Sequence, residues 1–362
     1  MNSKQTQLIK KIKYFDFIGE KGDYDNHVAM EDISVVYEGA KVKDAKDITL
    51  SIIIPTMNRP LLLKEAIESA LNQNTDVDFE IVILNNEGLI EGGNSKTDDI
   101  ILTMNSDRVM YYKNKSTVIS ADNWNTLLFL ARGKWICMLH DDDVLAPNAV
   151  QMLYDATRMN KKISFVGCIN VPFSGEERVE ADLRSIKVKK VSATEFMYGM
   201  PVSLLGAFFD RKKAIEIGGF ENRSYMQDYS FIAKYAHVFD MYLLKRGLYG
   251  YRISDVQDSA NNEMNFVRRV ADYYLWLSIA KRRGMLRRLF EKNCQYNIVH
   301  RIEWYNSDTK YEGNYIDLNE LLDVCEINKK KLHSYEYMLM KGLHGLVIIK
   351  DKLLNIITQG RC

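Results

Sequence analysis

GKWICMLHDDDVLAP, residues 133–147, is the stretch that decides the fold predicted for this chain. It contains a short apolar run, residues 135–139, followed by His140 and three consecutive aspartates at 141–143. A strand this apolar is typical of the middle of a parallel sheet, where both faces are covered. Open α/β sheets bind ligands at the carboxyl ends of their strands. The sequence therefore predicts a ligand site at these aspartates.

Three adjacent carboxylates repel one another unless something positive lies among them. A divalent metal is the natural guest, because Mg²⁺ and Mn²⁺ prefer carboxylate oxygens and keep coordination positions open for the phosphates of a substrate. The alternative interpretation is a solvated acidic turn before a helix, with Asp143 as the N-cap and Pro147 in the first turn.

The composition indicates an ordinary globular protein. The chain has 362 residues, 46% hydrophobic and 27% charged, which suits one large or two smaller domains. Its net charge of +1 gives no reason to expect nucleic acid as a partner. Five scattered cysteines without a CxxC pair fit a reducing compartment and argue against a disulfide framework or a zinc site.

The first residues carry no targeting signal that we recognise. Residues 1–17 lack the apolar core of a signal peptide, and no run reaches the roughly 18 consecutive apolar residues of a membrane span. We therefore expect a cytoplasmic protein. Residues 1–47 mix charged and aromatic side chains without a clear period, and we interpret them as an extension packed on the main domain.

Apolar runs and helical periodicity alternate from residue 50 onward. Strands are predicted at 50–54, 79–84, 109–112, 135–139 and 163–169. Helices are predicted at 62–71, at 124–130 with Gly133 as a left-handed C-cap, and from 148 to about 159, whereas residues 85–94 are predicted as loop. The alternation predicts a parallel α/β sheet.

The later elements are shorter. Strands are predicted at 204–209, 241–244 and 248–253, and helices from the capping box at 192–195, at 211–217 before Gly218 and Gly219, and at 227–236. Beyond about residue 259 the pattern becomes helical, and it is basic between 268 and 288. The apolar end, 337–357, is open to three interpretations: a packing helix, a dimer face or a membrane-surface helix.

Several segments in the same order resemble a family 2 glycosyltransferase. They are SIIIPTMNRP at 51–60, EIVILNNE at 80–87, the stretch 121–147, GAFFDRKKAIEIGGF at 206–220 and MQDYSFIAKYA at 226–236. The resemblance implies the GT-A fold, a Rossmann-like, mostly parallel sheet flanked by helices. It covers roughly residues 49–258 as a catalytic domain, leaving 1–48 as an N-terminal extension and 259–362 as a helical C-terminal region.

The resemblance also implies a reaction. It is the inverting, metal-dependent transfer of a sugar from a nucleotide-diphosphate sugar to a glycan or polyprenyl-phosphate-linked acceptor, in bacterial surface polysaccharide synthesis. Negative charge builds on the leaving diphosphate, so Mn²⁺ or Mg²⁺ bridging its phosphates lowers the barrier. By resemblance, Asp142 binds this metal and Asp141 faces the ribose or sugar. Asp143 is either a further group of the metal site or the helix cap.

The acceptor hydroxyl must lose a proton as it attacks, and a carboxylate opposite the leaving group can take it. The family places this base at the start of a helix after a GGF turn, where this chain has Gln227 and Asp228. Asp228 is therefore the candidate base, and without the resemblance it would pass for an ordinary first-turn acid.

The donor nucleotide should lie over the ends of the first two strands. The resemblance assigns five residues to it besides Asp141: Pro55, Thr56, Asn58, Asn86 and Asn125. An amide at position 86, where an aspartate is usual, both donates and accepts, so the preferred base could differ. The alternative interpretation of Asn85 and Asn86 is a simple turn.

Other functions fit the sequence less well. A nucleotidyltransferase or a dinucleotide-binding oxidoreductase needs a glycine-rich loop after the first strand, and residues 55–58 are not one. The QxxRW motif and membrane spans of processive synthases are missing. An inactive domain that acts as an assembly partner remains the alternative, because five residues depart from the family pattern: Asn85, Asn86, His140, Gln227 and Ser254. The basic helices and apolar tail suggest peripheral contact with the inner face of the cell membrane.

Overall fold

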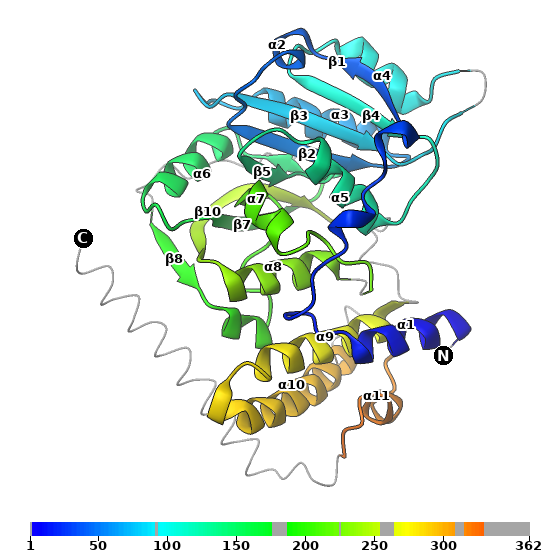
Figure 1. The fold of residues 1–362 in the computed structure, drawn as a ribbon, viewed down its shortest axis with the longest axis vertical. Helices are drawn as coiled ribbons and strands as arrows, with labels where there is room; N and C mark the ends of the chain where they lie inside the picture. The colour runs from blue at the N-terminus through cyan, green and yellow to red at the C-terminus, as the bar shows by residue number, and fades with distance from the viewer. Residues whose placement is uncertain are drawn as a thin grey trace.

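The computed structural model describes residues 2–90, 93–175, 187–223, 226–253, 264–307 and 315–328 (Figure 1). The apolar segment 337–357 and the departure at Ser254 lie outside these ranges. Within them, none of the helices combines the length and apolar character that crossing a membrane requires.

Four parallel strands form the centre of the fold, in the spatial order β4-β3-β2-β5. Their bounds are Leu50–Thr56 for β2, Phe79–Asn85 for β3, Val109–Asn114 for β4 and Trp135–Met138 for β5. Nearly every residue of these strands is buried, as continuous apolar runs predict. The expected mostly parallel α/β sheet is thereby confirmed.

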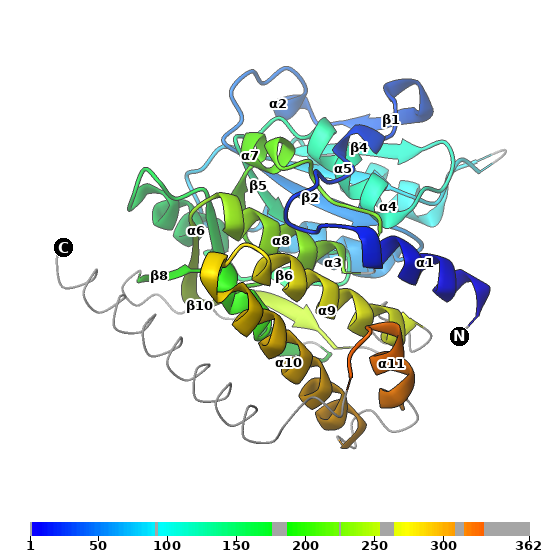
Figure 2. The same cartoon turned by 60° about the horizontal axis from the view of Figure 1, so that its bottom comes forward.

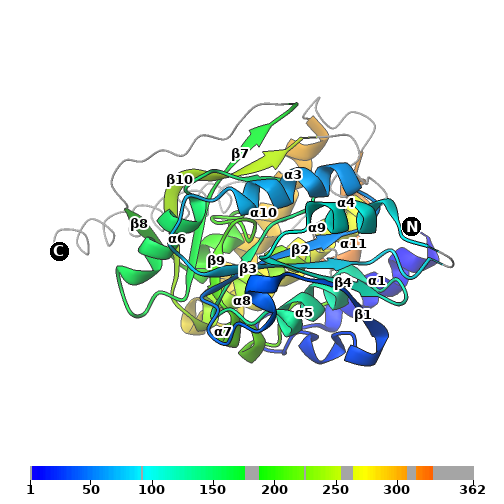
Figure 3. The same ribbon diagram turned by 90° about the horizontal axis from the view of Figure 1, so that it is seen from above.

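Helices cover both faces of this sheet. Helices α3 (Pro60–Leu71) and α4 (Lys96–Met104) lie on one face, and α5 (Ser120–Leu130) lies on the other (Figure 3). The connection from β2 to β3 therefore crosses one face of the sheet, and the connection from β4 to β5 crosses the opposite face. A crevice opens at the carboxyl ends of two neighbouring strands where the winding reverses in this way. Here those strands are β2 and β5.

The second half of the sheet is mixed. The full order is β1-β4-β3-β2-β5-β9-β7-β10-β6, with β8 also paired to β10. β9 runs antiparallel to both β5 and β7, whereas β7 and β10 are parallel. The bounds are Ile33–Glu38 for β1, Val144–Leu145 for β6, Phe165–Phe173 for β7, Val188–Val191 for β8, Phe208–Asp210 for β9 and Met241–Arg252 for β10.

The structure differs from the sequence prediction at four places. Residues 96–104, for which no helix was predicted, form α4, which begins at a capping box between Ser95 and Asp98. The two strands predicted at 241–253 are one strand, β10, whose register shifts around Gly247. The strand predicted at 204–209 shortens to β9. Residues 33–38 of the N-terminal extension pair with β4 as an edge strand.

Gly133 has a different role from the predicted C-cap. Helix α5 ends before Ala131, whose backbone is extended (φ −64°, ψ 138°), and Gly133 is not among the glycines with positive φ. A Cβ on Gly133 would lie 2.4 Å from the backbone nitrogen of Ser51 in β2. The glycine is therefore required by close approach of two backbones. Gly218 and Gly219, in contrast, adopt the predicted positive φ angles of 91° and 63°.

Short helices complete the domain. They are α2 (Ala40–Lys43), α6 (Ala149–Arg158), the 3-10 helix η3 (Ala193–Met197), α7 (Arg211–Glu216) and α8 (Gln227–Val238). The predicted capping box at Ser192 and Glu195 is present at the start of η3.

The helical region packs directly on the sheet domain. Its elements are α9 (Asn265–Ala280), the 3-10 helix η6 (Gly284–Leu286), α10 (Arg287–Ser307) and α11 (Leu318–Val324), and α1 (Ser3–Tyr14) lies beside α9 (Figure 2). Trp276 of α9 is buried and donates a hydrogen bond of 3.2 Å from Nε1 to the hydroxyl of Tyr229 in α8. One continuous core therefore joins the two parts.

The position of Gly133 gives a test of the fold. We expect Gly133→Ala to lower the free energy of unfolding by about 1–3 kcal/mol, because the new methyl group would force the backbone of β2 to move. Gly93→Ala is the matched control, since a Cβ there meets nothing within 4 Å. The measurement is chemical denaturation. Equal stability of the two variants would contradict the role assigned to Gly133.

Candidate active site

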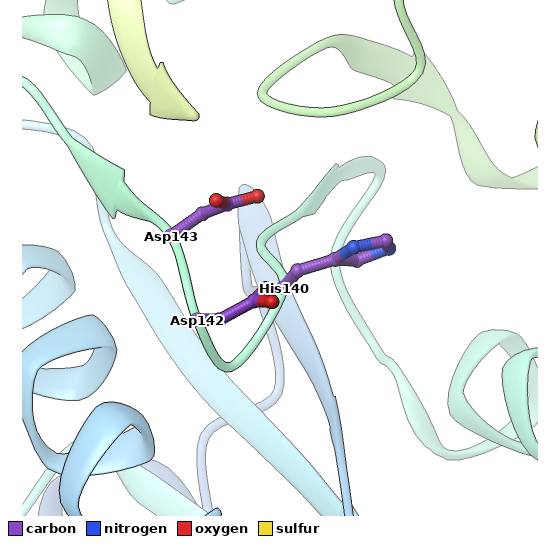
Figure 4. A group of neighbouring side chains, drawn as sticks. All are labelled: His140, Asp142 and Asp143. Carbon is purple, nitrogen blue, oxygen red and sulfur yellow. The ribbon is translucent and has the colours of Figure 1, made fainter. Parts of the chain in front are cut away.

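Residues 139–143 connect β5 to β6 at the crevice between β2 and β5, and four of them, His140–Asp143, form a polar loop. We call it the acidic loop. Figure 4 shows His140, Asp142 and Asp143 on this loop. It is held at its far end by antiparallel pairing of β6 with β10, Val144 opposite Gly250 and Leu145 opposite Tyr249.

Asp141 joins the acidic loop to the end of β2. Its Oδ2 accepts hydrogen bonds from the hydroxyl of Thr56 at 2.8 Å and from the backbone N–H of Met57 at 3.4 Å. Its Oδ1 lies 3.2 Å from Nη1 of Arg59. Burial raises the pKa of the Asp141 carboxyl, while the Thr56 hydroxyl and the Arg59 charge oppose that shift.

The same guanidinium also neutralises Asp142. Nη1 of Arg59 lies 3.0 Å from Oδ2 of Asp142, so one cation sits between two carboxylates. The backbone carbonyl of Asp142 accepts a hydrogen bond of 2.8 Å from Nε of Arg252. Both aspartates are less than a tenth exposed, which makes this compensation necessary.

Asp143 faces the other side of the loop, toward β10. Its Oδ2 accepts from the hydroxyl of Tyr249 at 2.7 Å, and its Oδ1 accepts from the backbone N–H of Arg252 at 2.8 Å. Burial raises the pKa of Asp143 to about 6, against the opposing influence of His140. The helix-cap interpretation is wrong, because the N-cap of α6 is Asn148 and Pro147 precedes it.

Three groups of the acidic loop could hold a metal ion together. A ligand atom from each of His140, Asp142 and Asp143 lies within 4.8 Å of the others. Nε2 of His140 is buried and has no hydrogen-bond partner among the described residues. Two carboxylates and an imidazole suit Mn²⁺. The buried Nε2 of His140 also favours a bound metal ion, because this nitrogen otherwise lacks a partner. If Asp142 bound a metal ion, Arg59 would have to share the Asp142 carboxylate with the metal or give up its ion pair with it.

Asp228 lies in the first turn of α8, where the helix dipole favours a negative charge. Its Oδ1 accepts a hydrogen bond of 2.8 Å from the N–H of Tyr229. Burial raises the pKa of Asp228, and the charges of His140 and Arg268 oppose the shift. The charge of His140 opposes the rise in pKa of both Asp143 and Asp228, so the imidazole lies within electrostatic range of both carboxyls.

The donor-side candidates are distributed around the same edge. Thr56 is buried and uses its hydroxyl on Asp141, and Pro55 precedes it within β2. Asn58 has an exposed side chain and a left-handed backbone (φ 58°), and its N–H donates to Glu87 at 3.0 Å. These residues line the route from β2 to the acidic loop.

Two of the predicted nucleotide contacts have other partners. The amide oxygen of Asn86 accepts from Asn114 at 2.9 Å and from the N–H of Val118 at 3.0 Å. Asn125 is completely buried, and its amide exchanges hydrogen bonds of 2.8 and 2.9 Å with the backbone of Phe220. We therefore leave Asn125 out of the site, because no donor or acceptor on it is free to meet a nucleotide.

Sequence reasoning missed four residues that shape the site. His140 was treated as a departure from the family pattern, although its imidazole joins the candidate metal cluster. Arg59 follows the first predicted strand, and its positive charge near the predicted ligand site is the signal that could have identified it. Tyr249 and Arg252 contact Asp143 from more than 100 positions away, and nothing in the local sequence could reveal that contact.

Comparison with known proteins gives a family match. The model of the family described as "Glycosyl transferase family 2" matches residues 51–219. The chain is 30% identical over 120 residues to an uncharacterized glycosyltransferase of Methanocaldococcus jannaschii, covering 32% of this chain and 40% of that protein. It is also 30% identical over 123 residues to the GalNAc(5)-diNAcBac-PP-undecaprenol beta-1,3-glucosyltransferase of Campylobacter jejuni, covering 33% and 38%. Each match thus spans about two fifths of the relative.

One solved structure is also similar. TarS 1-349 of S. aureus, in complex with UDP-GlcNAc, has 12% sequence identity and a TM-score of 0.48. The similarity covers 70% of this chain and 81% of that one.

The raised pKa of Asp143 predicts how metal binding depends on pH. A carboxylate must be deprotonated to bind a metal, so we expect Mn²⁺ affinity to rise with pH through about 6. At a pH one unit below that pKa, affinity should be about tenfold weaker than at neutral pH. Tyr249→Phe removes a hydrogen bond to the ionised carboxyl and should move the midpoint upward. The measurement is Mn²⁺ titration by electron paramagnetic resonance, and a flat pH profile would contradict the assignment.

Proposed function

We propose that the protein is an inverting, metal-dependent glycosyltransferase, because residues 51–219 match the model of glycosyl transferase family 2. Its donor is a nucleotide-diphosphate sugar, and its acceptor is a hydroxyl of a glycan or of a lipid-linked sugar. The observation that carries the proposal is the cluster of His140, Asp142 and Asp143, whose ligand atoms lie within 4.8 Å of one another. The charge of His140 also acts on the carboxyl of Asp228, the candidate base.

The acidic loop receives the diphosphate in this proposal. Asp142, Asp143 and His140 are the residues that would hold Mn²⁺ or Mg²⁺. When bound, the metal supplies positive charge against the leaving diphosphate. Arg59 already contacts Asp142 through one Nη1 atom, so it keeps the loop neutral before donor and metal arrive.

Asp228 performs the proton transfer. Its carboxylate takes the proton from the acceptor hydroxyl as that oxygen attacks the anomeric carbon. The bond from this carbon to the diphosphate oxygen breaks, and the electron pair leaves with the nucleoside diphosphate. A single base on the face opposite the leaving group gives inversion. Partial burial at the start of α8 raises the pKa of Asp228 and thereby makes it a stronger base.

The donor nucleotide lies over the end of β2 in this proposal. Pro55, Thr56 and Asn58 offer backbone and side-chain contacts to base and ribose. Asp141, whose carboxylate accepts a hydrogen bond of 2.8 Å from Thr56, is assigned to the sugar or ribose. Asn86 remains a candidate only through atoms that its contacts with Asn114 and Val118 leave free.

The proposed acceptor class follows from the name of one relative. One relative acts, by its name, on a PP-undecaprenol-linked glycan, and the match covers 38% of that protein. A polyprenyl-phosphate-linked acceptor in bacterial surface polysaccharide synthesis would require an enzyme at the inner face of the cell membrane. We include that peripheral location, and homo-oligomer formation, in the proposal.

The alternative is an inactive domain that acts as an assembly partner. One observation favours it: Nη1 of Arg59 lies 3.2 Å from Asp141 and 3.0 Å from Asp142, so a cation of the chain itself compensates both carboxylates. Gln227, which stands beside the candidate base, adds a departure from the family pattern. The two functions differ in whether the protein turns over a donor.

Asp228→Asn separates the two functions. In the transferase, this variant should release nucleoside diphosphate from its donor about 10²–10⁴ times more slowly, with donor affinity unchanged, because only the proton acceptor is lost. The wild-type rate should rise with pH through a pKa above the ordinary value for aspartate, since the base acts when ionised. The measurement is nucleoside diphosphate release across a panel of nucleotide sugars.

The control is Asp47→Ala, an exposed carboxylate in the loop before β2. It should keep the wild-type rate. Absence of turnover for every donor with well-folded wild-type protein would favour the inactive alternative, and unchanged turnover in Asp228→Asn would remove Asp228 as the base.

A further inference from the structure

The turn between α9 and α10 exposes an apolar tip. It consists of residues 281–286 and includes the short helix η6. Met285 is 103% exposed and Leu286 is 56% exposed. A single exposed leucine or methionine is ordinary on a protein surface, but two adjacent ones in one turn offer a partner a continuous apolar contact.

Positive charge surrounds this tip. Residues 281–288, KRRGMLRR, contain five cations and no acid. Arg282 pairs with Asp16 at 2.6 Å, and Arg287 pairs with Glu291 at 2.6 Å. Lys281 and Arg288 are exposed, and no hydrogen bond or ion pair of their side chains is found within the described residues. Among the described residues, Lys281 and Arg288 thus flank the tip as cations without an acidic partner.

A cavity of about 320 Å³ adjoins the turn. Arg283 lines it from the turn, Lys190 from β8, Ser192 from the start of η3 and His237 from the end of α8. Nε and Nη2 of Arg283 have no hydrogen-bond partner in the part of the chain that is described. Asp240, the acid in the cavity wall, forms an ion pair with Lys190, whose Nζ lies 2.5 Å from Oδ1 of Asp240. The cavity thus has an excess of donors and of positive charge.

The exposed apolar tip and the surrounding cations together indicate which kind of partner the turn binds. A polyanion such as RNA would use the cations but would leave Met285 and Leu286 in water. A bilayer with anionic lipids satisfies both, because its hydrocarbon edge accepts the apolar tip and its phosphates accept the cations. Charge complementarity together with the exposed tip therefore favours a membrane over nucleic acid.

We propose that the α9–α10 turn docks on an anionic membrane surface: Met285 and Leu286 enter the headgroup boundary, Lys281 and Arg288 contact lipid phosphates, and the cavity beside Arg283 accepts one headgroup phosphate. The inference deepens the peripheral location in the proposed function and takes its purpose, access to a lipid-linked acceptor, from it. Vesicle binding can nevertheless be measured without catalysis.

The docking turn lies at the opposite end of the molecule from α2 and β1 (Figure 1). Residues at that opposite end therefore serve as matched controls. Leu102 of α4 is a 38% exposed apolar residue near that opposite end, and Lys41 and Lys46 are exposed lysines in and after α2.

The test is co-sedimentation of the full chain with phosphatidylcholine vesicles, with and without phosphatidylglycerol, at low and high salt. We expect binding that requires phosphatidylglycerol and weakens with salt. Lys281→Gln/Arg288→Gln should lower the partition coefficient about thirtyfold, at roughly 1 kcal/mol for each cation. Met285→Asp should also lower it, whereas Leu102→Asp and Lys41→Gln/Lys46→Gln should bind as wild type does.

Two variants refine the result. Arg283→Gln should weaken binding to phosphatidylglycerol vesicles if the cavity holds a headgroup, with circular dichroism confirming that the variant is folded. Every turn variant should release nucleoside diphosphate at the wild-type rate, so failure of docking is distinguishable from failure of the proposed reaction. No binding of wild type to anionic vesicles, equal loss in the control variants, or RNA binding that depends on the same cations while vesicles are ignored would each overturn the proposal.

Discussion

Repulsion among three adjacent carboxylates is the constraint on which the site depends. Asp141, Asp142 and Asp143 are all nearly buried, so water cannot screen them. The chain compensates from two directions: Arg59 after β2 neutralises the first two, and the hydroxyl of Tyr249 with the N–H of Arg252 stabilises the third. These contacts join β2, the acidic loop and β10 at one edge of the sheet. Because the three carboxylates require positive charge nearby, the same edge of the sheet also suits a metal ion.

The sheet topology explains why these groups meet. β2 lies between β3 and β5, so the winding reverses beside it and the carboxyl ends of β2 and β5 open a crevice. Antiparallel pairing of β6 with β10 then holds the acidic loop from its far end. Asp228 enters from α8, and His140 couples it electrostatically to the loop. Metal-binding groups and a candidate base thus come from separate elements fixed by one core.

Much of the fold was predictable, because each central strand is a continuous apolar run and each covering helix has a clear period. The aspartates of the acidic loop were predictable for the same reason, being adjacent in sequence at the end of such a run. α4 was missed because glycines before it suggested a loop, although the Ser95 capping box was readable. Tyr249 and Arg252 reach Asp143 only through strand order, which local patterns do not encode. Local patterns also do not reveal that the amide of Asn125 bonds to the backbone of Phe220.

The central claim, that the acidic loop binds a divalent metal together with a nucleoside diphosphate, is tested most directly by thermal shift. Nucleoside diphosphates are compared with and without Mn²⁺ on wild type, Asp142→Ala and the exposed control Asp47→Ala. A ligand at about a hundred times its dissociation constant adds roughly 2.7 kcal/mol, which is readily detected. The account predicts a Mn²⁺-dependent shift for one nucleoside diphosphate that Asp47→Ala keeps and Asp142→Ala loses. A shift independent of Mn²⁺, or one retained in Asp142→Ala, would contradict it.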